Sequence, residues 1–437
     1  MSLNIPHTGQ RRVVVVGGGF AGLKLVRRLA RLDCQVVLID RNNYHQFQPL
    51  LYQVATSGLS PEDISFPFRK LFRGKRNVHF RMAELKAVEP DRRRIETSSG
   101  SLTYDYLVLA TGSVTNFFGM ESIREAAMPM KNLRDALVIR NRLLENLERA
   151  TVTRSRVERQ GLLNVVIVGG GPSGVELAGA VTEMKRYIMP EDYPDLDVDD
   201  INIYLVEGGP RLLASMSEKS SAEACMQLRR MGVRVMLGTS VVDYGEGRVR
   251  FRDGSFILTG NLVWTSGVTV EPIEGIDPMT VSRSGRIGVD DYSRVVGYHD
   301  IFVVGDAAMQ RDADHPDGFP QLARVAIEQA DHLSRNLAAL LRRRPMKPFV
   351  YREYPVMATV GRNRAFAEFG RRRVGGFVAW VAWALLHVAF VLGVKNKFNI
   401  LVGWAWNYVT YDHPVRLILA VGDPCRQALG KSVRLWE

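Results

Sequence analysis

Two glycine-rich loops, about 150 residues apart, constrain the fold of this 437-residue chain more than any other feature. In each, a short β-branched run leads directly into Gly-x-Gly-x-x-Gly, which opens a helical pattern. The first run is Val13–Val16 with the loop Gly17–Gly22, and the second is Val165–Val168 with the loop Gly169–Gly174. A buried parallel strand, a glycine loop and a helix in this order are typical of a dinucleotide-binding βαβ unit. A chance glycine turn explains one such loop far better than it explains two.

The first unit continues with a helical pattern over Leu23–Leu32 and a strand over Gln35–Ile39 that ends in Asp40. Its three glycines are expected to allow a tight turn, the approach of a pyrophosphate, and close packing of helix on strand. The acid is expected to accept a hydrogen bond from a ribose hydroxyl. In enzymes with two such units the N-terminal one usually holds FAD. The predicted FAD contacts here are Gly17, Gly19, Phe20, Ala21, Gly22, Asp40 and Arg41.

The second unit repeats the pattern with a helix over Val175–Met184 and, after a charged excursion, a strand over Ile203–Val206 that ends in Glu207. A carboxylate there repels the 2′-phosphate of NADPH, so NADH is the predicted ligand. Arg211 is close enough in sequence to soften this preference, although a solvated surface arginine is the simpler interpretation. The predicted NADH contacts are Gly169, Gly171, Pro172, Ser173, Gly174, Glu207 and Gly267.

Two further strands are predicted to close the FAD site, at Tyr106–Gly112 and at Asp300–Ala308. In two-dinucleotide flavoproteins an aspartate in the position of Asp306 binds the ribityl chain, and a following helix directs its N-terminus at the flavin. A helix N-cap is the alternative role. These segments supply Ala110, Thr111, Gly112, Gly305 and Asp306, and the remaining predicted FAD contacts are Gln48, Gln53, Leu85, Leu322 and Ala323.

The net charge of +12 is concentrated at the C-terminal end. From residue 340 on there are 16 Lys and Arg against 5 Asp and Glu, together with five of the six tryptophans: Trp380, Trp383, Trp404, Trp406 and Trp436. Within this tail, Phe377–Val394 is an apolar run flanked by Arg371–Arg373 and by Lys395 and Lys397. Three interpretations are open, namely a spanning helix, helices lying in the membrane interface, and a buried core helix. Basic flanks on short aromatic segments favour the interface.

Several classes of protein are disfavoured by what the sequence contains. The cations of the tail interleave with apolar runs instead of forming a polar stripe, so no nucleic-acid partner is expected. Cys34, Cys225 and Cys425 are far apart, so neither a redox pair nor a metal site is expected. His387 is expected to be a packed or interfacial residue and not a ligand. No apolar leader precedes Arg12, so no secretory signal is expected.

Four stretches carry a family resemblance beyond the glycine loops. They are Phe47–Ala55 followed by Gly58–Pro61, then Gly169–Glu176, Met357–Asn363, and Phe377–Tyr411 with its Gly-Trp-Ala-Trp-Asn-Tyr segment at 403–408. With these motifs the chain resembles the type II NADH:quinone oxidoreductases, also called alternative NADH dehydrogenases. The resemblance covers nearly the whole length.

The resemblance implies a non-proton-pumping reaction in which NADH delivers hydride to flavin N5 and two electrons then pass to ubiquinone or menaquinone. It implies attachment to the cytoplasmic face of the cell membrane through the C-terminal region, with quinone entering beside it, and a homodimer is possible. It also places Glu176, expected in the first turn of its helix, near the edge shared by nicotinamide and flavin. A carboxylate favoured by the helix dipole is the structural alternative.

The chain departs from the family in one motif near the flavin. The family has Ala-Gln-x-Ala-x-Gln, and here Ala323 is followed by Arg324, while Glu328 replaces the second glutamine. A second departure is Tyr351–Pro355, where an acid followed by glycine is common. We predict that Glu176 and Arg324 are the catalytic residues, with Arg324 either donating to a quinone carbonyl or abolishing the usual acceptor site.

The predicted fold is α/β, with an FAD domain split by an inserted NADH domain and followed by a helical membrane-association region. The predicted boundaries are 1–122 and 289–345 for the FAD domain, 123–288 for the NADH domain and 346–437 for the tail. The competing functions are an NADH-dependent flavin reductase of a protein acceptor and a flavin-binding membrane redox sensor with low turnover. Disulfide reductases and sulfide:quinone reductases are disfavoured because suitably placed cysteines are missing.

Overall fold

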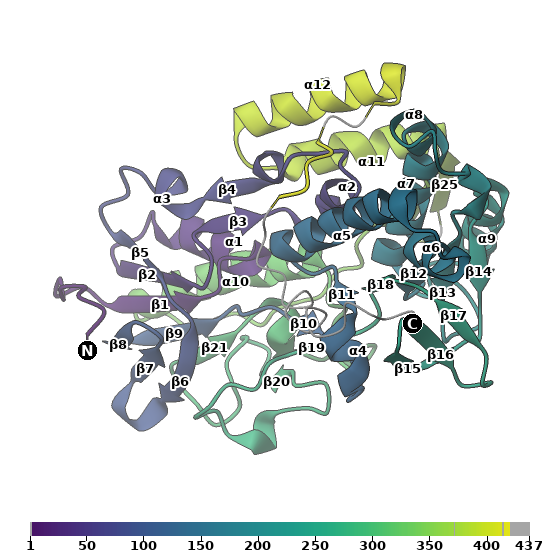
Figure 1. Cartoon of the computed structure of the whole chain (residues 1–437). Coiled ribbons are helices and arrows are strands. Elements are labelled where there is room, and N and C mark those ends of the chain that lie inside the picture. Colours follow the sequence, from purple (N-terminus) through teal and green to yellow (C-terminus); the bar gives the residue numbers. More distant parts are fainter. Residues whose placement is uncertain (1, 371, 413–414, 420–437) are drawn as a thin grey trace. The chain divides into compact units, whose positions relative to one another are not determined.

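The computed structural model describes residues 2–370, 372–412 and 415–419. These residues form two compact units, each assembled from several stretches of the chain (Figure 1). Unit 1 comprises the residues up to Gln46, Phe66–Val114 and Val268–Tyr354. Unit 2 comprises Phe47–Ser65, Thr115–Gly267 and the described residues from Pro355 on. Phe47–Ser65 therefore clusters with the second nucleotide fold and the tail, whereas the sequence boundaries group it with the first.

Unit 1 is built on a five-stranded parallel sheet in the order β21-β9-β1-β2-β5. The glycine-loop strand β1 is central and fully buried, with β2 on one side and β9 on the other. Side chains from this sheet and from the antiparallel strands β6, β7 and β8 form one buried cluster. The strands are β1 Arg12–Val16, β2 Gln35–Asp40, β3 Tyr44–Gln46, β5 Val78–Met82, β6 Leu85–Glu89, β7 Arg94–Thr97, β8 Gly100–Thr103, β9 Tyr106–Leu109, β20 Ile287–Gly288, β21 Ile301–Val303 and β22 Ala308–Met309.

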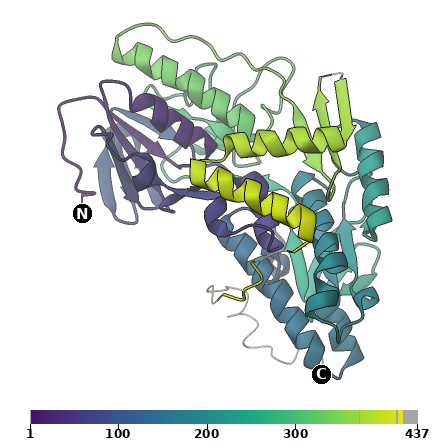
Figure 2. The same ribbon diagram turned by 90° about the horizontal axis from the view of Figure 1, so that it is seen from above.

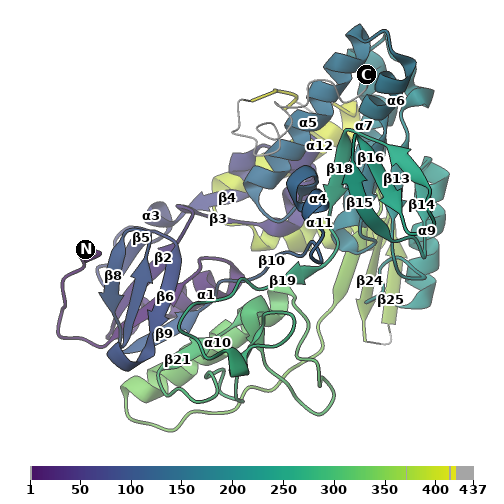
Figure 3. The same ribbon diagram turned by 60° about the horizontal axis from the view of Figure 1, so that its bottom comes forward.

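Helices α1 and α10 pack against each other in unit 1 and lie side by side in Figure 3. The apolar face of α1 is buried, including Leu25, Val26 and Leu29. Lys24 and Arg28, on another face of α1, form ion pairs with Asp331 of α10 at 3.2 Å and 2.7 Å. The helices of unit 1 are α1 Phe20–Leu29, α3 Phe68–Leu71 and α10 Ala323–Leu341.

Unit 2 repeats the architecture with a parallel sheet in the order β11-β18-β12-β13-β14. The second glycine-loop strand, β12, is again central and buried. Two antiparallel three-stranded sheets complete the unit, β15-β16-β17 and β23-β24-β25 (Figure 3). The strands are β11 Met128–Pro129, β12 Val165–Val168, β13 Ile203–Val206, β14 Arg234–Met236, β15 Val241–Gly245, β16 Arg248–Phe251, β17 Phe256–Leu258, β18 Asn261–Trp264, β23 Val356–Thr359, β24 Ala365–Phe369 and β25 Arg372–Gly376.

Helix α7 connects β12 to the rest of unit 2 and packs on β13, β23 and α9. An added Cβ at Gly179 would lie 2.8 Å from the backbone nitrogen of Gly361, so the helix packs tightly on the turn after β23. The helices of unit 2 are α2 Leu51–Ala55, α4 Glu121–Ala126, α5 Leu133–Val152, α6 Arg156–Leu163, α7 Pro172–Tyr187, α8 Met189–Asp192, α9 Glu218–Met231, α11 Phe377–Phe390 and α12 Val394–Thr410.

The tail forms two helices that lie beside each other (Figure 2). The apolar run does not continue as one helix to Val394, because α11 ends at Phe390 and α12 begins at Val394. No helix among the described residues has the length and apolar character needed to cross a bilayer. The core-helix interpretation is wrong, since Val378, Leu385 and Val409 are 69%, 64% and 78% exposed. Arg371, Cys425 and Trp436 lie outside the described residues.

Helix α12 directs two asparagines toward the protein and several large apolar side chains away from it. Asn396, Ile400, Trp404 and Asn407, spaced along one side, contact the protein. The amides of Asn396 and Asn407 donate to backbone carbonyls of the 58–65 segment at 2.8–3.3 Å. The exposed residues of α12 include six large apolar ones, Val394, Phe398, Leu401, Val402, Trp406 and Val409, together with the polar Lys395, Asn399 and Thr410. Exposed apolar side chains gathered on one helix in this way are typical of an interaction surface.

Candidate functional site: two glycine loops and a buried acidic cavity

The glycines of the two loops meet the same steric demands, each within its own unit. Gly17 and Gly169 have φ of +99° and +116°, a region that favours glycine. An added Cβ at Gly22 would lie 1.8 Å from the carbonyl oxygen of Gly17, and one at Gly174 would lie 1.9 Å from that of Gly169. This geometry fits the tight turn and the close packing that the sequence predicts for these glycines.

The middle glycines of both loops face open space. A Cβ at Gly19 or Gly171 would meet no atom within 4 Å. These residues are also the N-caps of α1 and α7, and as glycines they bring no side chain to the helix N-terminus. Free backbone N–H groups at a helix start are a site for phosphate. The residues present therefore fit a dinucleotide pyrophosphate at each loop.

The acid at the end of the second strand is held in the same way in both units. Asp40 accepts hydrogen bonds from the backbone nitrogens of Gly18 at 2.6 Å and Asn42 at 2.7 Å. Glu207 accepts from the nitrogens of Gly170 and Gly209, both at 2.6 Å. A carboxylate has further lone pairs, so both acids still have capacity for a ribose hydroxyl. Burial raises the pKa of Asp40.

The segments predicted to close the first site meet in unit 1. Ala110, Thr111 and Gly112 follow β9, and Gly17 packs against the Ala110 carbonyl. Asp306 accepts a hydrogen bond from the Ser113 hydroxyl at 2.6 Å. Gly305 has φ of +76°, and its N–H donates to Gln329 at 2.8 Å.

The structure does not make Asp306 a helix N-cap, the alternative role that the sequence left open. The residue lies in a three-residue 3-10 helix, Gly305–Ala307, which leads into the short strand β22. The next α-helix, α10, begins only at Ala323. Asp306 therefore lies inside a 3-10 turn whose N-cap is Val304, and the α-helix that follows it in the chain is α10.

Arg324 lies in the first turn of α10, after Leu322 at the N-cap and Ala323 at the first helical position. Its guanidinium forms an ion pair with Glu328 one turn later at 2.7 Å and lies over the ring of Tyr354 at 5.4 Å. The two departures from the family motifs therefore contact each other within unit 1. The cation that replaces a glutamine has its charge offset by the acid that replaces the second glutamine.

The remaining predicted contacts have ordinary structural partners. Gln48 donates to the carbonyl of Lys131 at 3.3 Å. Arg41 lies 3.8 Å from Glu271 on the surface, and Leu85 begins β6 and packs on the core of unit 1. Arg211 donates to the carbonyls of Ala214 and Met216, so it is not a freely solvated arginine. Gly267 has φ of +73° beside the ring of Phe118.

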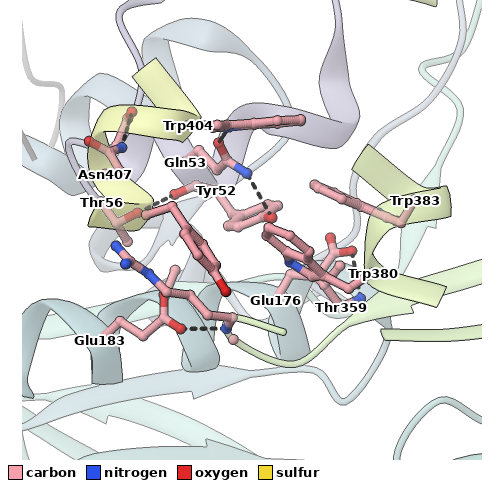
Figure 4. A pocket seen from close by; sticks show the side chains of 15 residues that line it. Tyr52, Gln53, Thr56, Glu176, Glu183, Thr359, Trp380, Trp383, Trp404 and Asn407 are labelled. Carbon is pink, nitrogen blue, oxygen red and sulfur yellow. Dashed lines mark hydrogen bonds and ion pairs between the residues drawn. The ribbon is translucent and has the colours of Figure 1, made fainter. Parts of the chain in front are cut away.

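A cavity of about 90 Å³ lies within unit 2, beneath the tail helices (Figure 4). Sequence reasoning predicted Glu176 and Gln53 for the catalytic and FAD sites but did not place them in a common cavity. The Gln53 amide accepts from the Trp404 indole at 2.7 Å and donates to the Tyr52 hydroxyl at 3.0 Å. The lining residues are Tyr52, Gln53, Thr56, Gly58, Glu176, Ala180, Glu183, Thr359, Gly361, Arg362, Trp380, Trp383, Trp404, Asn407 and Tyr408.

Glu176 is the buried acid of this cavity. It lies in the second turn of α7, beyond the first turn expected from the sequence, so stabilisation by the helix start does not explain it. Glu176 is 9% exposed, and its carboxylate accepts a hydrogen bond from the backbone nitrogen of Thr359 at 3.3 Å. Burial raises its pKa to about 8. A carboxyl group with this pKa can both hold and release a proton near neutral pH.

Two glycine loops on two similar α/β folds define a two-dinucleotide oxidoreductase. Residues 11–330 match the family described as Pyridine nucleotide-disulphide oxidoreductase. The chain is 32% identical over 418 residues to Type II NADH:quinone oxidoreductase NdhA of Mycobacterium tuberculosis, covering 92% of this chain and 88% of that one. The second enzyme of that name in the same organism, Ndh, is also 32% identical, over 417 residues. The chain belongs to the type II NADH:quinone oxidoreductase family.

Solved structures agree on the fold. The structure of NDH2 from Plasmodium falciparum in complex with NADH has a TM-score of 0.84 at 19% identity and covers 94% of this chain and 100% of that one. The sulfide:quinone oxidoreductase of Aquifex aeolicus follows the same fold with a TM-score of 0.69 at 18% identity, over 91% and 94% of the two chains. In this protein Cys34 and Cys225 are both free and buried, and burial raises the pKa of the Cys34 thiol to about 11. The Cys34 thiol therefore keeps its proton near neutral pH and is not a reactive thiolate.

Proposed function

We propose that the protein oxidises NADH and reduces a membrane quinone, without pumping protons. FAD held by the first glycine loop, when bound, supplies the two-electron chemistry that links these substrates. The observation that carries the proposal is the matched pair of loops, each with an open middle glycine, an unobstructed helix start and an acid held at the adjacent strand end. The names of the curated relatives support the same substrates.

The residues of the first loop and of the adjacent strand end bind and orient the dinucleotide. Gly19 gives the pyrophosphate access to the N-terminus of α1, and Asp40 receives a ribose hydroxyl. Asp306, positioned by the Ser113 hydroxyl, is proposed to receive the ribityl hydroxyls. In the second loop Gly171 has the corresponding role, and Glu207 favours NADH because its charge repels a 2′-phosphate. Glu176 holds the proton that quinone reduction consumes.

The outer face of α12 and α11 is proposed to lie on the cytoplasmic surface of the cell membrane, where lipid-soluble quinone reaches the protein. The exposed apolar side chains of α12 support this, because the amide N–H groups of Asn396 and Asn407 on its other side donate to backbone carbonyls of the protein. Lys395 and Lys397 lie in the first turn of α12, beside these apolar side chains, and their positive charges suit anionic lipid head groups. Ubiquinone and menaquinone are both compatible with it, and a homodimer stays a prediction.

The reaction is tested with the purified protein in detergent, NADH and a short-chain ubiquinone or menaquinone. We expect NADH to bleach the flavin absorbance and the quinone to restore it. Bleaching that only a ferredoxin-type protein reverses would overturn the proposal in favour of a protein acceptor. Bleaching that no acceptor reverses at a useful rate would favour a redox sensor.

Membrane attachment is tested by replacing two exposed residues of α12, Leu401 and Val409, with serine. We expect the variant to lose most of its co-sedimentation with anionic phospholipid vesicles, because about 25 cal/mol is lost for each Å² of apolar contact. The matched control is Val152→Ser, a residue on α5 that is 79% exposed. Equal sedimentation of both variants and the original protein would refute attachment through α12.

A further inference from the structure

One face of α7 presents two carboxyl groups to the cavity of unit 2, the buried Glu176 and the partly buried Glu183. Glu176, Ala180 and Glu183 are spaced i, i+4 and i+7, so they lie along one side of the helix. Seven residues of helix separate the two acids by about 10 Å along the axis. Because the residue between them is alanine, no side chain fills the space along this face. Figure 4 shows both acids directed into the cavity.

The polar lining of this cavity requires water. Asn407 Oδ1 and Arg362 Nη1 are buried and have no hydrogen-bond partner within the described ranges 2–370, 372–412 and 415–419. Buried polar atoms without a protein partner are usually satisfied by ordered water. A volume of about 90 Å³ holds several water molecules, since one occupies roughly 30 Å³ in the liquid. The space between the carboxyl groups can therefore hold a hydrogen-bonded chain of water.

The two ends of the cavity differ in their access to solvent. Glu183 accepts a hydrogen bond from the backbone nitrogen of Arg362 and has a side chain that is 17% exposed. The guanidinium of Arg362 lies 4.2 Å from the ring centroid of Tyr411, a residue that is 39% exposed. Glu176, by contrast, is covered by Tyr52 and Thr359. The Glu183 end is therefore the side from which solvent reaches the cavity.

We propose that Glu183 receives protons from solvent and passes them through cavity water to Glu176. This inference rests on the proposed function, whose overall reaction is NADH + H⁺ + quinone → NAD⁺ + quinol and takes one proton from solvent in each turnover. Only O–H bonds form and break along the path, from water to Glu183, through water to Glu176, and on to a quinol oxygen. Glu183 is a positioning and relay residue, since it does not touch the substrate.

The other titratable groups around the path do not replace Glu183. Tyr52 from α2 has a pKa raised by burial, so it keeps its proton. Burial raises the pKa of Glu183, and the charge and backbone N–H of Arg362, after β23, oppose this effect. Tyr408 of α12 is the remaining titratable residue that lines the cavity. A water path along α7 therefore has a carboxyl group at each end.

The test is Glu183→Gln, which keeps the shape of the side chain and removes the exchangeable acid. The two half-reactions are followed separately by stopped-flow flavin absorbance, in H₂O and in D₂O, on both sides of the Glu176 pKa of about 8. We expect unchanged bleaching by NADH, about 10- to 100-fold slower recovery with a short-chain ubiquinone, and a larger solvent isotope effect on recovery. Glu183→Asp should recover part of the rate.

Two further variants keep the result interpretable. Ala180→Val adds methyl groups between the acids and should slow recovery in the same way, with the flavin still bound. Glu191→Gln removes an exposed acid on α8 and should behave as the original protein. Recovery of Glu183→Gln at the original rate, with an unchanged isotope effect, would overturn the relay alone. Failure of the original protein to recover with quinone would instead overturn the proposed function.

Discussion

The two βαβ units begin alike and diverge at the fifth residue of their first helix. Counted from the last glycine of each loop, Lys24 of α1 occupies the position of Glu176 in α7, and Arg28 that of Ala180. In unit 1 these cations are partly exposed and pair with Asp331 of α10. In unit 2 the equivalent positions line a buried cavity. The shared nucleotide-binding motif therefore determines the strand, the loop and the start of the helix. The elements that pack on the helix determine whether the side chains at these two positions form ion pairs, as on α1, or line a cavity, as on α7.

The largest expected effects come from the matched packing glycines, Gly22 and Gly174. A methyl group at either position would lie less than 2 Å from a carbonyl oxygen of its own loop, so the loop must move. We expect Gly22→Ala to lower FAD content, and Gly174→Ala to retain FAD but raise the NADH concentration for half-maximal bleaching by roughly 100-fold, about 2.7 kcal/mol. Absorbance spectra and NADH titrations measure both.

Gly245→Ala is the control for these variants, because a Cβ there meets nothing within 4 Å. Loss of FAD from the Gly174 variant, together with retained FAD and a raised NADH requirement in the Gly22 variant, would reverse the assignment of the two loops.

The next prediction compares how equivalent positions of α7 and α1 affect the dependence of protein stability on pH. The pKa of Glu176 is raised by burial from 4.5 to about 8, so the folded protein binds more protons than the unfolded chain between these values. Its contribution to stability is therefore present below about pH 4.5 and falls as pH rises toward 8, by at most about 1.4 kcal/mol per pH unit.

Between about pH 4.5 and 8, Glu176→Gln should flatten the dependence of the thermal midpoint on pH, whereas Lys24→Gln at the equivalent position of α1 should leave that part of the curve unchanged. Thermal unfolding at a series of pH values measures both variants. An unchanged slope in the Glu176 variant would contradict the burial of an ionisable acid.

Nucleotide preference gives a smaller difference between the units. Glu207→Gln removes the negative charge and keeps an oxygen acceptor for one of the two N–H groups, those of Gly170 and Gly209, that the two carboxylate oxygens bind. We expect the ratio of kcat/KM for NADPH to that for NADH to rise about 10-fold, near 1.4 kcal/mol. Asp40→Asn, the matched change in unit 1, should leave that ratio unaltered. A shift with Asp40→Asn instead would place the nicotinamide nucleotide in the first unit.

The smallest effect concerns the ion pairs that cover α1. Burial raises the pKa of Asp331, but hydrogen bonds from Arg28 and Lys24 outweigh burial and lower it overall. Asp331 therefore stabilises the fold above the ordinary carboxyl range and loses this contribution as pH falls, the opposite of Glu176. Asp331→Asn should destabilise the protein by about 1 kcal/mol or less at neutral pH, because its partners are partly exposed. Urea unfolding measures this, and a loss several times larger would refute a peripheral role.

Local chemistry made the nucleotide folds predictable from sequence. The strands Val165–Val168 and Ile203–Val206 and the steric roles of Gly17, Gly22, Gly169 and Gly174 follow from residues that are neighbours in the chain. The helix starts were placed three residues late, because the glycine loop itself supplies the first turn. Helix α1 begins at Phe20 and α7 at Pro172.

The cavity could not be derived in this way, because Gln53 and Trp404 are about 350 residues apart and meet only in the fold. The family resemblance marked the stretches 47–55, 357–363 and 403–408, which supply much of its lining, but gave no reason for their common location. Glu183 carried no signal beyond its spacing of seven from Glu176. The inward asparagines of α12 were likewise present in the sequence but acquire meaning only when their backbone partners are known.

The central claim is that the two loops serve NADH oxidation with a quinone as acceptor. It is tested most directly by sequential mixing of the purified flavoprotein with the two substrates. The protein is first mixed anaerobically with one equivalent of NADH and then with a short-chain ubiquinone, while flavin absorbance is followed. We predict full bleaching in the first step and full recovery in the second, with one quinol formed for each NADH oxidised. Bleached flavin that persists in the presence of ubiquinone and menaquinone would contradict the account.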